Sequence, residues 1–268
     1  MTATALRRTR PPGDLAQAGV VALLLALAAI TWVLTHRRMA GMDAGPGSDL
    51  GGLGWFAATW ALMMAAMMLP VVAPMVAAYR GRTAGLGATP AFAAGYLIAW
   101  LAAGLFGYAL VEGVRSLDLG FLAWDEAGRY VAGSLILGGA LYQLTGPKDA
   151  CLRRCRHPRA FLGDHWRPSR LGAVRMGAEH GGFCVACCWG LMAALFALGV
   201  MSTAWMALVA AMIAAERLLP WKTIAGRAVA VALALLALGV AFAPEQVPGF
   251  TVPGAHQGEP SMDSMQMP

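Results

Sequence analysis

The segment from Gly181 to Gly199, GGFCVACCWGLMAALFALG, carries no charged residue and contains three of the five cysteines of the chain. The hydrocarbon core of a membrane requires about 17 to 25 apolar residues in a helix, and this segment has that length. Six more apolar segments lie around it: Leu15–Thr35, Trp55–Tyr79, Pro90–Val111, Arg129–Thr145, Thr203–Leu219 and Ile224–Ala243. The sequence therefore predicts an all-α, polytopic transmembrane bundle of about seven spanning helices.

The composition excludes an ordinary soluble domain. Hydrophobic residues make up 59% of the chain and charged residues 13%, whereas a soluble domain is about one quarter charged. The net charge of +6 is spread between apolar segments, so we expect the lipid bilayer, and no nucleic acid, as a partner. The chain also lacks a phosphate-binding Gly-rich loop and an Asp-Lys-Thr-Gly phosphorylation segment. We therefore expect no ATP-driven transport, and the residues do not predict an enzyme.

The distribution of basic residues predicts the orientation of the helices. If the N-terminus is cytoplasmic, sixteen of the twenty lysines and arginines lie on the inner side, and four lie outside: Arg37, Arg38, Arg115 and Arg129. Basic residues accumulate in cytoplasmic loops, so we expect an N-in, C-out protein of the bacterial inner membrane. Residues 1–14 are then a cytoplasmic segment and residues 15–243 the bundle, with a basic cytoplasmic loop at 146–179. We expect residues 244–268 to form a flexible, Met-containing periplasmic tail.

A stripe of soft metal ligands is predicted on the helix of the opening segment. His180, Cys184, Cys187 and Cys188 are separated by steps of one, three and four residues, and helical steps of three and four place side chains on one face. Thiolate and imidazole groups suit Cu(I) or zinc better than magnesium or calcium. Two-coordinate Cu(I) needs only two thiolates, whereas zinc normally takes four ligands. We therefore expect Cu(I) as the bound ion, with zinc as the weaker alternative.

Methionines on the second predicted helix supply a further set of soft ligands. Met63 and Met67, and likewise Met64 and Met68, are four residues apart and so form two adjacent stripes. Pro70 and Pro74 remove backbone donors and are expected to kink the helix, which favours a central position where freed carbonyls are shielded from lipid. A stripe of this kind also fits simple core packing, because methionine fills irregular gaps.

Weaker candidates for metal ligands lie outside the apolar segments. Cys151 and Cys155 are one helical turn apart among arginines, which favour the thiolate form. Met39 and Met42 belong to a His-x-x-Met-x-x-Met-Asp cluster on the predicted outer side, and the tail adds Met262, Met265 and Met267. Thioethers retain affinity for Cu(I) in an oxidising compartment. A polar loop and a solvated tail are the alternatives to ligand sites there.

Several motifs match one bacterial membrane family. They are Trp60 with Met63-Met64-Ala-Ala-Met67-Met68-Leu-Pro70, then Tyr142-Gln-Leu-Thr with Lys148 and Cys151-Leu-Arg-Arg-Cys155, then His180-Gly with Cys184, Cys187-Cys188-Trp189 and Met192, then Gly199-Val-Met201 and Trp205-Met206, and finally Glu216-Arg217-Leu-Leu-Pro220. Over about residues 39 to 222 the chain resembles the family called domain of unknown function 2182, described as predicted metal-binding integral membrane proteins. The resemblance implies a metal role and no particular reaction.

The favoured function is therefore the handling of a soft metal, most simply copper. We expect the chain to bind Cu(I) for metal transfer or cuproenzyme assembly, with a metal donor or acceptor protein as partner. One alternative is a thiol-redox membrane enzyme or quinone-linked subunit that uses Cys184, Cys187 and Cys188. A second alternative is a structural assembly partner whose cysteines and methionines only pack.

The predicted orientation can be tested with reporter fusions at the C-terminus. Because the C-terminus is expected outside the cytoplasm, an alkaline phosphatase fusion there should be active and a cytoplasmic reporter at the same position inactive. The reverse pattern of activities would exclude the N-in, C-out assignment.

Overall fold

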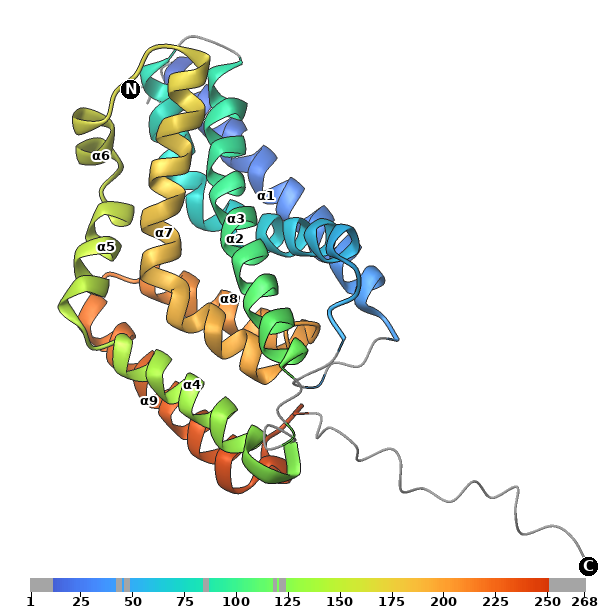
Figure 1. Cartoon of the computed structure of the whole chain (residues 1–268). Helices are drawn as coiled ribbons and strands as arrows, with labels where there is room; N and C mark the ends of the chain where they lie inside the picture. Colours follow the sequence, from blue (N-terminus) through green and yellow to red (C-terminus); the bar gives the residue numbers. More distant parts are fainter. Residues whose placement is uncertain are drawn as a thin grey trace, which may run out of the picture. The chain divides into compact units, whose positions relative to one another are not determined.

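A computed structural model describes residues 12–41, 45, 49–83, 87–117, 120 and 124–250, and its regular structure there is helical (Figure 1). The all-α prediction is confirmed. Residues 1–11 and 251–268, which hold most of the predicted N-terminal segment and tail, lie outside the described part. The elements are, in chain order, α1 (Pro12–Met39), α2 (Leu53–Arg82), α3 (Ala88–Ser116), the π-helical turn η2 (Trp124–Gly128), α4 (Arg129–Tyr142), α5 (Gly146–Arg156), α6 (Pro158–Asp164), α7 (Arg170–Gly199), α8 (Thr203–Leu218), α9 (Lys222–Phe242) and the 3-10 turn η3 (Pro244–Gln246).

Five of the described helices, α1, α2, α3, α7 and α9, are long and apolar enough to cross a bilayer. The chain is thus a multi-pass membrane protein. The fourth and sixth predicted spans correspond to α4, with 14 residues, and α8, with 16 residues. At 1.5 Å per residue these helices are about 21 and 24 Å long, less than the hydrocarbon thickness of about 30 Å. Seven spans therefore remain a prediction.

The structure corrects the predicted boundaries around the basic segment 146–179. The connection predicted there contains α5, α6 and the first turns of α7, and its cytoplasmic location stays a prediction. Helix α7 begins at Arg170 and not at Gly181, so the cysteines lie near its middle. The physical reason is that charges oppose insertion into lipid but not helix formation. In the first turns, Arg175 pairs with Glu179 one turn later at 3.1 Å, while Ala173 and Met176 are buried.

The chain divides by its internal contacts into two compact units. The first comprises the described residues within Met1–Thr35, Ala57–Leu105 and Asp149–Cys187, and the second those within His36–Phe56, Phe106–Lys148 and Cys188–Pro268. The long helices α1, α2, α3 and α7 contribute residues to each unit.

In the first unit, glycines bring α3 and α7 into backbone contact. A Cβ added to Gly95 would overlap the carbonyl oxygen of Val174, and one added to Gly177 would overlap that of Phe92. Gly181 lies in the same way against Tyr96, with its added Cβ 2.9 Å from the Tyr96 carbonyl oxygen. Small residues four apart allow close helix packing in membranes. The indole of Trp60 on α2 completes this core by donating a hydrogen bond to the Trp100 carbonyl at 2.9 Å.

In the second unit, α4 packs along α9, and the two ribbons run side by side in Figure 1. Gly133 allows this contact, since an added Cβ would lie 2.9 Å from the Cβ of Ala241. Gly139 of α4 lies against the backbone of Gly190 in α7, where an added Cβ would be 2.6 Å from the carbonyl oxygen. Helix α8 begins with a side-chain cap, because the Ser202 hydroxyl accepts a hydrogen bond from the Trp205 amide.

We expect Gly177→Ala to destabilise the protein and Gly182→Ala, on the same helix, to leave it as stable or slightly more stable. The first added methyl group would overlap the Phe92 carbonyl, while the second has no neighbouring atom within 4 Å. Overpacking costs about 1 to 3 kcal/mol, whereas alanine in place of glycine in an open helical site gains about 0.5 to 1 kcal/mol. Thermal unfolding of the two variants in detergent measures the difference. Equal unfolding temperatures would contradict the proposed backbone contact.

Candidate metal centre

Three thiols of α7 form a compact group. The Sγ atoms of Cys184, Cys187 and Cys188 all lie within 4.8 Å of one another. Their side chains are buried, with exposed fractions of 0%, 2% and 2%. The grouping follows from the helix itself, since residues three and four apart occupy the same face of adjacent turns. The predicted cysteine stripe is thus present as a cluster of soft donor atoms shielded from solvent.

Within the first unit, Cys184 contacts an aromatic hydroxyl. The Tyr96 hydroxyl on α3 lies 3.0 Å from Cys184 Sγ, at hydrogen-bonding distance. The Cys187 thiol donates to the Cys184 carbonyl at 3.2 Å. Tyr96 was not predicted as part of the site, because nothing in its sequence spacing relates it to Cys184, 88 residues later. The contact depends on the close α3–α7 packing.

His180, one turn before Cys184, is enclosed by aromatic rings of the first unit. Its side chain is 1% exposed, and its ring centroid lies 5.1, 5.9 and 6.2 Å from those of Phe161, Tyr96 and Phe92. Because α7 already begins at Arg170, His180 and Cys184 belong to one continuous helix, as the stripe requires. Coordination by the imidazole stays a prediction.

In the second unit, Cys188 lies beside a buried cation. The Arg217 guanidinium donates through Nη2 to Cys188 Sγ at 3.8 Å. The preceding residue, Glu216, forms a buried ion pair with Lys148 at the start of α5. No spacing in the sequence relates Lys148 to Glu216, which lies 68 residues later. The sequence does contain one indication of such contacts, because the last turn of the otherwise apolar α8 holds a glutamate and an arginine. Two charged residues in a membrane helix are costly unless they have partners.

The predicted methionine ligands of α2 are all buried. Met63, Met64, Met67 and Met68 have exposed fractions of 2% or less, and α2 continues as one helix through Pro70 and Pro74. Burial is expected both of metal ligands and of packing residues, so the ligand role of these four thioethers stays a prediction.

The weaker candidate ligands differ in their burial and in whether the structure describes them. Cys151 is partly exposed and Cys155 is buried, both on α5. Met39 does not lie in an outer loop, because it is the last residue of α1 and is 4% exposed. Met42 lies outside the described residues, as do the methionines of the tail.

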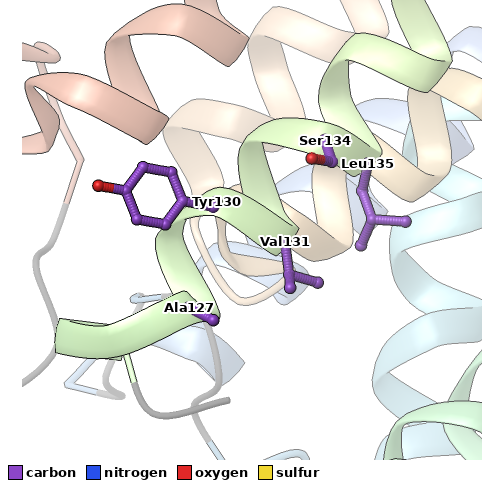
Figure 2. A pocket seen from close by; sticks show the side chains of 5 residues that line it. All are labelled: Ala127, Tyr130, Val131, Ser134 and Leu135. Carbon is purple, nitrogen blue, oxygen red and sulfur yellow. The ribbon is translucent and has the colours of Figure 1, made fainter. Parts of the chain in front are cut away.

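The surface depression drawn in Figure 2 offers no alternative metal centre. It has a volume of about 340 Å³ and is lined by Ala127, Tyr130, Val131, Ser134 and Leu135 of η2 and α4. Its polar groups are one phenol and one hydroxyl, which are poor ligands for a soft metal. The thiol cluster of α7 is therefore the stronger candidate.

Three buried thiols grouped on one helix of a multi-pass membrane protein form a donor set that suits a soft metal ion. The chain is a member of the PpoB2 copper chaperone family, whose family model matches residues 57–240. The match includes the thiol cluster and the methionines of α2. Neither a curated protein nor a solved structure matches the chain. The family confirms the expectation of copper and identifies the metal role as that of a chaperone, which transfers copper to a partner.

Alkylation of the folded protein should distinguish the buried thiols from those of α5. We expect a maleimide to modify Cys151 first, because it is partly exposed, and Cys184, Cys187 and Cys188 only after denaturation, because they are at most 2% exposed. Peptide mass spectrometry after timed labelling measures the order. Modification of the cluster as fast as Cys151 would contradict its burial.

Proposed function

We propose that this chain binds Cu(I) at Cys184, Cys187 and Cys188 and transfers it to an acceptor protein at the bacterial inner membrane. The observation that carries the proposal is the buried group of three Sγ atoms within 4.8 Å of one another, in a chain of a copper chaperone family. Copper is here the cargo, so the site must both hold the ion and release it.

The donor set favours the monovalent ion. Cu(I) prefers soft thiolate and thioether ligands, and two thiolates are enough for a linear site. Zinc would normally require four ligands, and α7 supplies three thiols. A third thiol beside a two-coordinate ion also provides a route of exchange, because it can bind before one of the first two leaves. This is the property that a transfer protein needs.

Additional ligands are proposed from the neighbouring soft donors. His180 is one helical turn from Cys184 and is enclosed in the first unit. Met63, Met64, Met67 and Met68 are buried on α2. We assign these residues to the path or the coordination shell of copper. For Cys151, Cys155, Met39 and Met42 we propose only transient contacts during delivery or release of the ion, so these four residues do not set the affinity of the thiol site.

The proposed orientation remains N-in and C-out. It is supported by the excess of basic residues on one side of the predicted spans. The thiols then belong to a helix whose first, basic turns face the cytoplasm, where thiols stay reduced. The donor or acceptor protein would meet the chain on either side of the membrane.

Metal binding by matched cysteine variants tests the proposal. The reduced protein, purified in detergent, is titrated with Cu(I) in competition with a chromophoric chelator. We expect the Cys184→Ser/Cys188→Ser variant to lose affinity by more than about 100-fold, since even the loss of a residue that only supports a metal ligand costs about 10- to 100-fold. The Cys151→Ser/Cys155→Ser variant, which removes the same number of thiols from α5, should retain the affinity of the unmodified chain.

Two results would contradict the proposal. One is an unmodified chain that takes up no copper and instead cycles between thiol and disulfide, as the thiol-redox alternative requires. The other is a Cys184→Ser/Cys188→Ser variant that binds copper as tightly as the unmodified chain, which would leave the cysteines a packing role.

A further inference from the structure

The buried charges of the second unit lie on or against the last turn of α8, and one of them contacts Cys188. Among the described residues, the buried side chains with a formal charge are Lys148, Glu216 and Arg217, with exposed fractions of 1%, 2% and 8%. Lys148 and Glu216 form an ion pair, and the Arg217 guanidinium donates to Cys188 Sγ at 3.8 Å. Placing such groups inside a membrane protein is costly, so the burial of all three, and the contact of Arg217 with a thiol, require an explanation.

Two adjacent residues at the end of α8, Glu216 and Arg217, make these two contacts with different helices. Successive residues of a helix point about 100° apart, so Glu216 can face Lys148 of α5 while Arg217 faces Cys188 of α7. The ion pair holds one anion and one cation, and Arg217 brings the sum of the three charges to +1. A guanidinium keeps its charge in a buried site and, being weakly hydrated, is the cation best suited to it.

The net charge of +1 on Lys148, Glu216 and Arg217 matches a Cu(I) thiolate complex better than that of a divalent ion. Cu(I) held by two thiolates is a complex with net charge −1, and together with the three side chains the total is zero. A divalent ion on the same two thiolates, with the third thiol still protonated, leaves a total of +1 in a buried region, where like charges repel strongly. The surroundings of Cys188 therefore favour a monovalent ion.

We propose that Arg217 is a specificity-determining residue that selects Cu(I) over divalent zinc by balancing the charge of the thiolate complex. Arg217 does not coordinate the ion, and its effect acts through Cys188. The inference rests on the proposed function, since it assumes that Cys188 and a second thiol of the cluster bind copper.

The experiment compares the affinities of full-length variants for Cu(I) and for Zn(II), each by chelator competition in detergent. Arg217→Gln should lower the ratio of Cu(I) affinity to Zn(II) affinity by about 10- to 100-fold, the range usual for residues that support metal ligands. Arg217→Lys, which keeps the charge, should lower the ratio less. Arg175→Gln is the matched control, because Arg175 lies on α7 with a side chain 65% exposed and should leave the ratio unchanged.

The ratio separates charge selection from a structural role. An Arg217→Gln variant that loses both metals equally, or that keeps the ratio of the unmodified chain, overturns the inference while copper binding itself stands. An unmodified chain without Cu(I) affinity overturns the proposed function and this inference together. If Arg217→Gln does not fold, the Glu216→Gln variant provides the test of charge selection. Removing this carboxylate makes the surroundings of Cys188 more positive, which should disfavour the divalent ion more than Cu(I). The ratio for this variant should rise, and a fall would overturn the inference.

Discussion

Direct backbone contact between α3 and α7 is the constraint on which the first unit depends. Gly95 and Gly177 leave no room for a side chain, since a Cβ at either position would overlap a carbonyl oxygen of the opposite helix. Tyr96 follows Gly95 immediately, and Cys184 lies about two turns after Gly177 on the same helix. The close approach therefore places the Tyr96 hydroxyl 3.0 Å from Cys184 Sγ. The absence of side chains at Gly95 and Gly177 thus determines which groups surround the Cys184 thiol.

In the second unit, buried charges act together with close packing at glycines such as Gly133 and Gly139. Helix α8 ends in a glutamate and an arginine that are both buried, and each has a partner on a different helix, Lys148 on α5 and Cys188 on α7. Breaking a buried ion pair by removing one partner costs several kcal/mol. These contacts fix the end of α8, and the selectivity proposed for Arg217 uses a charge that the helix already holds in place.

The features that the sequence predicted well depend on residues close to each other along the chain. The apolar segments predicted helices, and the spacing of Cys184, Cys187 and Cys188 predicted one cluster, because helical periodicity relates residues within a few positions of each other. The start of α7 at Arg170 was missed, since Arg175 and Glu179 were assigned to a basic loop, although their spacing of four suits an ion pair along a helix. Tyr96 and Arg217 were missed because contacts between helices depend on packing, and no spacing in the sequence relates either residue to its cysteine.

The length of α7 bears on the depth of the thiols. A helix of 30 residues is about 45 Å long, about 15 Å more than the hydrocarbon layer is thick. Arg175, which is exposed, would be costly inside lipid, so we expect it at the level of the headgroups. Cys184 and Cys188 follow it by nine and thirteen residues, or about 14 and 20 Å along the axis. In a helix that crosses the bilayer, the thiols are therefore near its midplane, where an ion is dehydrated and can move only from one protein donor atom to the next.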